Sequence, residues 1–263
     1  MNDLQVIILA AGKGTRLGEL GRQLPKALIK TGQYQETIIS RLINQFSKIA
    51  SRVIVVSGHR SDLLLPYLKK NYPKVTAVEN RAYDQGSNLS SLGVGLRSLD
   101  GYCGRLLVVD GDTYLSNQSF DEITRIIENY AYDECISQGI IFTTRSKRCE
   151  GEWSIETDAD NRIISISDHP SEEDEITSGV CLFCYSTMQF LRSHASHIND
   201  GLRYWDDIYF YNFRNMNMKG YHISGFVAEV DTLEDIDILW KRGERSYDNW
   251  RRHKSLINRI RDL

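Results

Sequence analysis

The chain has 263 residues, with 32 lysine and arginine residues against 35 aspartate and glutamate residues, and a formal net charge of −3 at pH 7. This near balance argues against a nucleic-acid coat or a polybasic membrane anchor. A hydrophobic fraction of 41% supports one large or two small α/β domains and excludes a wholly disordered chain. The apolar stretch at residues 6–11 is too short for a membrane helix and has no signal-peptide features, so we expect a cytoplasmic protein.

Strands and helices alternate through the first half of the sequence. Residues 6–11, 53–56 and 106–109 are unbroken apolar runs, which predict buried strands. Helices are expected between them, over residues 37–50 with one apolar face, and onward from an N-cap at Ser61. This alternation predicts βαβ units and a mainly parallel sheet.

The second half has a different rhythm. Short strands separated by polar turns are expected over residues 139–144, 153–156, 163–167 and 179–185. The tail from residue 234 to 263 is predicted to be helical and is basic, which permits a homodimer without requiring one. No Pro/Gly/Ser-rich linker divides the chain, so a single domain is expected. The five cysteines are odd in number and scattered, which favours reduced thiols over a disulfide framework.

A glycine-rich loop follows the first predicted strand. Residues 9–17 have the sequence L-A-A-G-K-G-T-R-L, and Pro25 and Lys26 follow downstream. The two glycines let the backbone approach a polyphosphate, while Arg16 and Lys26 add positive charge at both ends of the loop. The loop therefore predicts a phosphate-binding site.

Two common phosphate motifs are disfavoured by particular residues. A dinucleotide-binding fingerprint would need glycine at position 17, which is Leu17 here. A Walker A loop would need serine or threonine directly after Lys13, where the chain has Gly14. An NAD-dependent oxidoreductase and a P-loop ATPase are both disfavoured.

Acidic residues follow two predicted strands. Asp110 and Asp112 end the strand at residues 106–109, and Glu229 and Asp231 follow a strand late in the chain. Mg²⁺ prefers a few carboxylate oxygens plus substrate phosphates, so acids from two strand ends could share one ion. Two alternatives stay open: Asp231 could cap the last helix, and the D-x-D string also occurs in glycosyltransferases that use nucleotide sugars.

The loop with its Pro-Lys pair resembles the L-A-A-G-x-G-T-R-L…P-K signature of the nucleotidyltransferase superfamily. This resemblance implies a Rossmann-like α/β domain with a mixed, mainly parallel central sheet and helices on both faces. It also implies a reaction that joins a nucleoside triphosphate to a phosphorylated acceptor and releases pyrophosphate. In such a protein Arg16 would hold the β- and γ-phosphates, Lys26 would contact the α-phosphate or the acceptor, and Asp112 and Asp231 would hold Mg²⁺.

A segment of small and amide residues, 80–91, suits a base edge or the N-terminus of a helix. It resembles the N-x-x-Y-x-x-x-x-N-x-x-S region around the cytosine in bacterial phosphocholine cytidylyltransferases, and the likeness continues in order over nearly the whole chain. Ser87 or Asn88 could instead simply cap the helix. The nucleotide-binding candidates are Leu9, Ala10, Ala11, Gly12, Gly14, Thr15, Arg16, Asn80, Ser87, Asn88 and Asp110.

The acceptor site is expected to combine aromatic rings with carboxylates, because both hold an ammonium group. An aromatic residue packed in the core is the alternative at each position. The candidates for the ammonium are Trp153, Tyr204, Trp205, Asp206 and Glu229, and those for the acceptor phosphate are Arg145 and Lys147.

These features lead to one functional hypothesis with three rivals. The favoured activity is a magnesium-dependent cytidylyltransferase that transfers CMP from CTP to phosphocholine, or to a similar phosphate or phosphonate such as aminoethylphosphonate, for the decoration of a surface glycan. Residues 1–138 would bind the nucleotide, residues 139–232 the acceptor, and residues 233–263 would form a C-terminal helix. The rivals are a sugar-1-phosphate nucleotidyltransferase using UTP or another triphosphate, a nucleotide-sugar-dependent glycosyltransferase, and a non-catalytic nucleotide-binding relative.

Overall fold

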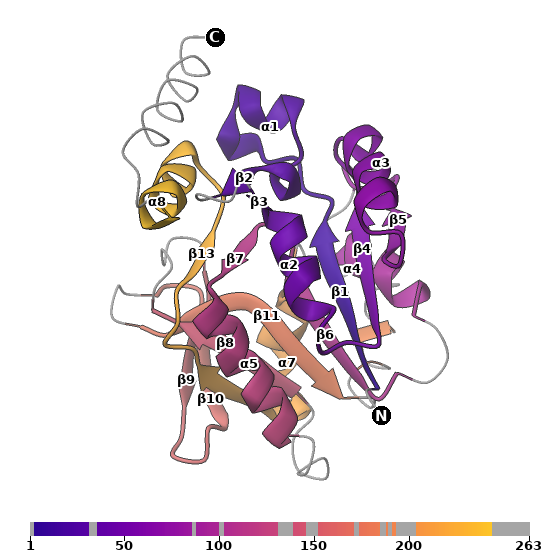
Figure 1. Cartoon of the computed structure of the whole chain (residues 1–263). Helices are drawn as coiled ribbons and strands as arrows, with labels where there is room; N and C mark the ends of the chain where they lie inside the picture. Colours follow the sequence, from indigo (N-terminus) through magenta and orange to yellow (C-terminus); the bar gives the residue numbers. More distant parts are fainter. Residues whose placement is uncertain are drawn as a thin grey trace.

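The computed structural model describes residues 3–31, 36–85, 88–99, 103–130, 139–145, 152–170, 174–184, 188, 191–192 and 204–243 (Figure 1). Within these residues a nine-stranded mixed sheet forms the centre of the molecule. Its strands are β1 (Leu4–Ala10), β4 (Arg52–Ser57), β5 (Thr76–Glu79), β6 (Arg105–Asp110), β8 (Gly139–Thr144), β9 (Ser154–Thr157), β10 (Ile163–Ser167), β11 (Ile176–Cys184) and β12 (Met218–His222). The main strand order is β10-β9-β11-β6-β1-β4-β5, with β8 beside β11 and β12 beside β8.

Helices cover both faces of this sheet. The described helices are α1 (Glu19–Gln23), α2 (Ile38–Phe46), α3 (Ser61–Asn71), α4 (Asn88–Arg97), α5 (Asn117–Tyr130), α7 (Asp207–Met216) and α8 (Leu233–Gly243), of which α2, α3 and α5 lie on one face and α4 and α7 on the other. Short 3-10 helices span Thr15–Leu17 and Lys26–Leu28, and two small ribbons pair β2 (Lys30–Thr31) with β3 (Glu36–Thr37) and β7 (Thr113–Leu115) with β13 (Val227–Glu229).

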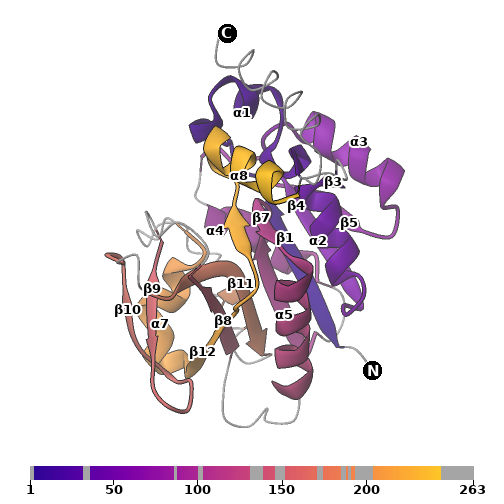
Figure 2. The ribbon, with the colours of Figure 1, turned by 60° about the vertical axis from the view of Figure 1, so that its left-hand side comes forward.

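The alternation of side chains along β1 explains the two layers of helices. Val6 and Ile8 join a buried cluster with α2, α3 and α5, whereas Ile7 and Leu9 join a second cluster with α4 and α7. Helices α2 and α5 lie side by side on the first face, where the rings of Phe46 and Phe120 meet edge to face at 5.7 Å (Figure 2). The predicted α/β class, mixed sheet and helices on both faces are therefore confirmed.

The strand order places the functional loops. Strands β6, β1, β4 and β5 are parallel, and the chain crosses from β1 through α2 to β4 and through α3 to β5 before α4 returns it to β6 on the other side of β1. The direction of crossing therefore reverses between β1 and β6. At such a switch point the loops after the two strands part and leave a crevice at their carboxyl ends.

The second half contains the short strands that the sequence predicts, and they form mainly antiparallel pairs, except that β12 pairs parallel with β8. Strand β11 pairs antiparallel with β6, β8 and β9, and β9 pairs antiparallel with β10. Strand β11 begins at Ile176, earlier than the predicted start at residue 179, because Ile176 and Thr177 already pair with β8. An irregularity between Thr177 and Cys181 gives Gly179 a positive φ of 76°.

Two local expectations need correction. The helix predicted over 37–50 ends at Phe46, and Thr37 caps it by accepting a hydrogen bond from the Ser40 amide. Ser61 is not an N-cap: it is the first residue of α3, Arg60 holds the capping position with a φ of 52°, and the Ser61 hydroxyl donates to Glu79. The sequence could not reveal this because the partner of Ser61 lies on a different element.

Some expectations fall partly outside the described residues. Helix α8 confirms the start of the C-terminal helix, but the chain beyond residue 243 is not described. Cys103 and Cys181 are buried free thiols and Cys184 is half-buried, while Cys135 and Cys149 lie outside the described residues. In the described part of the chain, no helix is both long enough and apolar enough to cross a membrane.

Candidate active site

A cavity of about 470 Å³ opens at the carboxyl ends of β1 and β6. The loop after β1 and the turn after β6 both line it, together with segments from the second half of the chain. The structure thus brings most of the predicted site residues to one place: Leu9, Ala10, Ala11, Gly12, Gly14, Thr15, Arg16, Lys26, Asn88, Asp110, Asp112, Trp153, Tyr204, Trp205, Asp206, Glu229 and Asp231.

The two glycines of the loop after β1 are required for different physical reasons. Gly14 has a φ of 61°, a conformation that suits glycine, and a Cβ there would lie 3.0 Å from Cγ of Lys26. A Cβ on Gly12 would meet nothing within 4 Å, so this glycine leaves the backbone open to the cavity. Gly14 shapes the loop, and Gly12 leaves room for a ligand.

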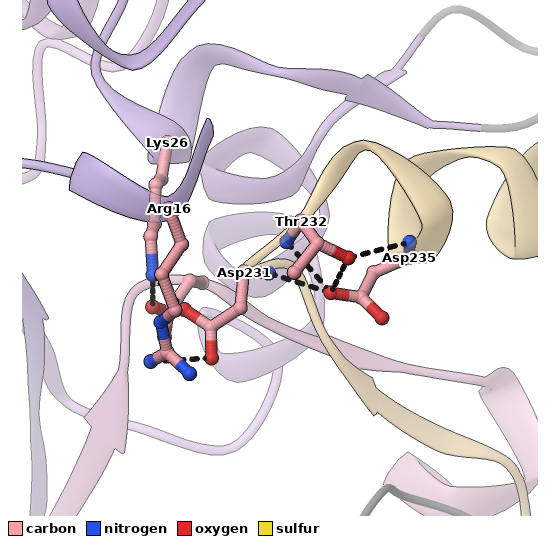
Figure 3. A network of polar contacts seen from close by, with 6 residues as sticks. Arg16, Lys26, Asp231, Thr232 and Asp235 are labelled. Atoms are coloured by element: carbon pink, nitrogen blue, oxygen red, sulfur yellow. Dashed lines mark hydrogen bonds and ion pairs between the residues drawn. The ribbon is translucent and has the colours of Figure 1, made fainter. Parts of the chain in front are cut away.

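The charged side chains of Arg16, Lys26 and Asp231 lie close together beside this loop (Figure 3), and Asp112 also contacts Lys26. Lys26 Nζ donates to Asp112 Oδ2 at 2.8 Å and also to Asp231 Oδ1, and Arg16 Nη2 lies 2.7 Å from Asp231 Oδ2. Burial of the Lys26 ammonium works against its charge, but Asp112 and then Asp231 outweigh it, and the pKa of Lys26 is raised above its ordinary value. Both acids thus face cations at the edge of the phosphate loop.

The Asp231 carboxylate is available for this network because a neighbouring pair caps α8. Thr232 Oγ1 accepts from the Asp235 amide, and Asp235 Oδ2 accepts from the amides of Thr232 and Asp231, a reciprocal capping box (Figure 3). The alternative in which Asp231 caps the last helix is therefore wrong.

The donor set formed by Asp112 and Asp231 fits Mg²⁺. Both carboxylates hydrogen-bond to the same ammonium of Lys26, so they already face one cation. Mg²⁺ usually takes one or two protein carboxylates and completes its shell with water and substrate phosphates. Among the described residues, no group of three or more His, Cys, Asp and Glu side chains is arranged as metal ligands.

Aromatic and acidic side chains from the second half of the chain also line the cavity. The Trp153 ring stacks on Phe210, with centroids 3.8 Å apart and an interplanar angle of 29°, and Tyr204 is 56% exposed. Apart from Asp231, the lining carboxylates of this half, which we call the acidic side, are Glu152, Asp168, Asp206 and Glu229. The cations that line the cavity, among the described residues, are Lys13, Arg16 and Lys26, all on the loop side.

Asp206 has an unusual protonation equilibrium. Burial is the main cause that raises its pKa to about 7, and the charges of Asp207 and Glu152 raise it further, while a hydrogen bond from Trp153 lowers it. A cation placed next to Asp206 would favour its ionised form. The group is thus poised to gain a charge when a cationic ligand arrives.

Trp205 lies between the two sides of the cavity. Its backbone amide donates to Asn88 Oδ1 at 2.7 Å, and its indole Nε1 donates to Asp110 Oδ1 at 2.9 Å. The side chain is 2% exposed and packs edge to face against Phe183 and Tyr209. Its flanking residues, Tyr204 and Asp206, line the acidic side.

Two predicted site residues do not line the cavity. Asn80 is 3% exposed, and its amide nitrogen donates to the hydroxyls of Ser90 and Ser91. These hydrogen bonds hold α4 in place and direct the Asn80 side chain into the core. Arg145 Nη2 lies 3.6 Å from Glu175 Oε1, away from the cavity lining. The structure does not bring either residue to the cavity, because the direction of a side chain depends on packing that neither residue type nor spacing shows. Ser87 and Lys147 lie outside the described residues.

Sequence reasoning missed several lining residues. Lys13 lies in the glycine-rich loop, where its charge was a sufficient signal, and its Nζ is 5.9 Å from the centroid of the Tyr83 ring. Glu152 adjoins the predicted Trp153, which was a weaker signal. Asp168, Thr177 and Tyr209 also line the cavity, but nothing in their local sequence distinguishes them.

Comparison with known proteins supplies a family match. The model described as the MobA-like NTP transferase domain matches residues 6–194. The chain is 23% identical over 240 residues to the 2-aminoethylphosphonate cytidylyltransferase of Lancefieldella rimae, which covers 88% of this chain and 89% of that protein. It is 26% identical over 240 residues to the choline-phosphate cytidylyltransferase of Streptococcus pneumoniae, which covers 88% of this chain and 95% of that protein.

A solved structure shares the fold. The CTP:phosphocholine cytidylyltransferase from Streptococcus pneumoniae superposes with a TM-score of 0.73 at 24% identity, and the match covers 92% of this chain and 99% of that one. The single α/β domain with a mixed sheet is thus a known architecture.

Proposed function

Because the chain belongs to the family with the MobA-like NTP transferase domain, we propose that it is a magnesium-dependent cytidylyltransferase that acts on a small ammonium phosphate or phosphonate. The chain is a nucleotidyltransferase, as its family match and its relatives agree. The proposed reaction transfers CMP from CTP to phosphocholine, 2-aminoethylphosphonate or a similar acceptor and releases pyrophosphate. The product would be a CDP-linked head group of the kind that decorates surface glycans.

The observation that carries this proposal is that one cavity combines a cationic glycine-rich loop, whose cations pair with Asp112 and Asp231, with a further set of carboxylates and aromatic rings. Lys13, Arg16 and Lys26 lie on the loop side, which suits a triphosphate. The other side has four carboxylates together with the rings of Trp153 and Tyr204, which suits an ammonium group. A molecule with an anionic end and a cationic end would be oriented by this difference alone.

On the loop side, the chain's own groups would bind the triphosphate. The backbone from Ala11 to Thr15 lines the cavity, and Gly12 leaves room for a phosphate to approach it. Arg16 is 64% exposed and can turn toward the β- and γ-phosphates, whereas Lys26 is 14% exposed and more firmly held. Asn88 lines the same cavity at the start of α4, where an amide can contact a base edge.

The proposed chemistry is an in-line displacement at the α-phosphorus. An oxygen of the acceptor phosphate or phosphonate forms a bond to the α-phosphorus, and the bond from that phosphorus to the bridging oxygen of the β-phosphate breaks. The electron pair leaves with pyrophosphate. Since the attacking oxygen is already ionised near pH 7, no side chain has to remove a proton, and catalysis rests on positioning and charge neutralisation.

Asp112 and Asp231 are the proposed ligands of Mg²⁺. When bound, the ion would neutralise phosphate charge and help orient the reacting groups. Lys26 touches both carboxylates and would keep the two acids in place beside the phosphate loop.

The acidic side distinguishes an ammonium acceptor from a sugar phosphate. A sugar ring has hydroxyls that can bond to carboxylates, but it has no positive charge to offset four of them. A quaternary or primary ammonium offers that charge, and each desolvated contact with an aromatic face adds about 0.5–2 kcal/mol. The proposal therefore favours a cationic acceptor over glucose 1-phosphate.

A substrate panel tests this function. Pyrophosphate release would be measured with Mg²⁺ for CTP, UTP, GTP and ATP, each crossed against phosphocholine, 2-aminoethylphosphonate and glucose 1-phosphate. A Lys26→Met variant should lose activity, and Arg22→Gln is the matched control, because Arg22 is an exposed cation of the same region that pairs with Glu19.

The expected result is release with CTP and an ammonium acceptor only. Release with glucose 1-phosphate and UTP would contradict the acceptor proposal while leaving the nucleotidyltransferase itself in place. Equal activity of the wild type and Lys26→Met would contradict the role given to the loop side.

A further inference from the structure

We propose that Trp205 is a positioning residue that couples the two substrate subsites, so that a bound nucleotide raises the affinity for the acceptor. This inference rests on the proposed two-substrate function and adds a means by which one side of the cavity responds to the other. Trp205 itself need not touch either substrate. It acts through its neighbours.

The first link runs from the nucleotide side to the backbone of the acceptor side. Asn88 is the first residue of α4, and its Oδ1 accepts from the Trp205 amide at 2.7 Å. The Asn88 side chain also lines the cavity. A base or ribose that engages this amide would therefore act directly on the backbone at residue 205.

The second link runs through the indole ring. Trp205 Nε1 donates to Asp110 Oδ1 at 2.9 Å, and Asp110 ends β6, two residues before Asp112. A shift of the turn after β6 when the triphosphate binds would move the hydrogen-bond acceptor of the indole. The two links begin on different elements and converge on one residue.

Packing turns these links into a stiff connection. The Trp205 side chain is 2% exposed and is held between Phe183 of β11 and Tyr209 of α7, with ring centroids 6.3 and 5.7 Å away. A ring buried this tightly has little freedom to absorb a displacement. Movement at either link is therefore passed to the adjoining residues, Tyr204 and Asp206, which line the acidic side.

The consequence is a reciprocal coupling between ligands. If the nucleotide raises acceptor affinity by a given factor, the acceptor must raise nucleotide affinity by the same factor. Couplings of this kind usually amount to about 5–150-fold. We expect at least about fivefold in the wild type.

The test compares variants that remove one hydrogen bond each. Trp205→Phe keeps a buried ring but loses the indole N–H, and Asn88→Ala removes the other link from its far end. The matched control is Trp240→Phe: Trp240 is 5% exposed on α8, its Nε1 donates to the Lys30 carbonyl at 3.2 Å, and it does not line the cavity. A loss of stability alone would appear equally in the control.

Calorimetry would give the acceptor Kd with and without saturating α,β-methylene CTP and Mg²⁺. The ratio of the two Kd values should be at least fivefold in the wild type and in Trp240→Phe, and below about twofold in Trp205→Phe and Asn88→Ala. An unchanged ratio in Trp205→Phe, or a ratio of one in the wild type, would overturn the proposal.

A second measurement tests the coupling through Trp205 without depending on the identity of the acceptor. Hydrogen exchange of the segment 204–210 would be followed with the nucleotide analogue alone, using the analogue of whichever triphosphate the wild type turns over. The inference predicts slower exchange in the wild type and in Trp240→Phe, and no change in Trp205→Phe. This protection would remain even if no ammonium acceptor were used, whereas its absence in the wild type would overturn the coupling whatever the acceptor.

Discussion

The two sides of the cavity are built in different ways. The loop side takes its backbone and its cations from residues 9–16 and Lys26, and only the acids that pair with these cations, Asp112 and Asp231, come from distant turns. The acidic side is assembled from four separate places, which are residues 152–153, 168, 204–206 and 229. A contiguous motif can be recognised in a sequence, whereas residues from distant segments form a site only when the fold brings them together.

The two sides also differ in charge, and this difference has a chemical meaning. The loop side has cations that are paired with Asp112 and Asp231 beside the proposed phosphate path, whereas the acidic side has carboxylates and rings and no lining cation among the described residues. An acceptor with a phosphate at one end and an ammonium at the other would lie across the cavity with its phosphate toward the α-phosphorus. Orientation of this kind supplies much of the rate gain when no proton has to be moved.

The largest effect is expected where the two sides meet, at Asp112. Replacing it by asparagine removes a carboxylate from Lys26 and from the proposed Mg²⁺ site, so kcat should fall by about 10²–10³-fold, in line with about 2.7–4 kcal/mol for a lost transition-state contact. Pyrophosphate release measures this. Asp121→Asn, at an exposed acid on α5, is the control and should keep wild-type activity. Full turnover by Asp112→Asn would remove Asp112 from the metal site.

Substitutions at two glycines distinguish a residue needed for the fold from one needed for ligand binding. Gly179 has a φ of 76°, and a Cβ there would lie 2.7 Å from Thr113 Oγ1, so Gly179→Ala should lower the free energy of unfolding by about 1–3 kcal/mol. Gly12→Ala meets no neighbour and should change it by less than about 0.5 kcal/mol, while raising the KM for CTP. Thermal unfolding and steady-state kinetics distinguish the two. An unstable Gly12→Ala variant would contradict an open phosphate loop.

The acidic side should show a pH dependence that the loop side does not. The pKa of Asp206 is raised to about 7, and in the proposed function its ionised form binds the cation, so the KM for phosphocholine should be about tenfold higher at pH 6 than at pH 8. The quaternary ammonium of phosphocholine does not titrate. Asp206→Asn should lose this part of the pH dependence, and titration of the acceptor phosphate should remain in both proteins.

The stability of the wild type and of Asp206→Asn tests whether the pKa of Asp206 is raised by folding. Because the folded pKa of Asp206 is raised from 3.8 to about 7, the folded state holds the proton more tightly, and the free energy of unfolding should fall as the pH rises through this interval. The free energy of unfolding of Asp206→Asn, measured relative to that of the wild type, should therefore be higher at pH 8 than at pH 4. A difference that does not vary with pH would show that folding leaves the pKa of Asp206 at its ordinary value.

The smallest effect is expected at Trp153. One face of its ring is covered by Phe210, which leaves a single partly exposed face for a cation, and such a contact contributes about 0.5–1 kcal/mol. Trp153→Leu should raise the acceptor KM by about 2–5-fold and leave the KM for CTP unchanged. Phe213→Leu, on α7 but outside the cavity lining, is the control. Equal changes in both KM values would indicate a general structural role.

The sequence could predict the features that depend on local patterns, but not those that depend on contacts between distant residues. The apolar runs around β1, β4 and β6 and the glycine-rich loop are local patterns, and the structure bears out their strands and places the loop at the cavity. The contacts of Lys26 join residues 86 and 205 positions away, a separation that no local pattern encodes. Asp112 and Asp231 were paired with the loop only through the resemblance to a family.

The differences between the predicted and the observed lining residues have a common physical cause. Asn80 and Arg145 have suitable side chains in suitable segments, but Asn80 turns inward to two serine hydroxyls and Arg145 pairs with Glu175. Side-chain direction depends on register and packing, and one polar side chain has many partners of similar energy. Asp168 was missed for the same reason, since its position at the cavity depends on the placement of the strands before and after it.

The most direct measurement compares acceptors that differ only in their positive charge. With CTP and Mg²⁺, kcat/KM would be determined for phosphocholine against 3,3-dimethylbutyl phosphate, and for 2-aminoethylphosphonate against propylphosphonate. The opposite charge of the two sides predicts a preference of about tenfold or more, or about 1.4 kcal/mol, for the charged member of the pair that the protein uses. Equal kcat/KM values within both pairs would contradict the central claim that the acidic side binds a cation.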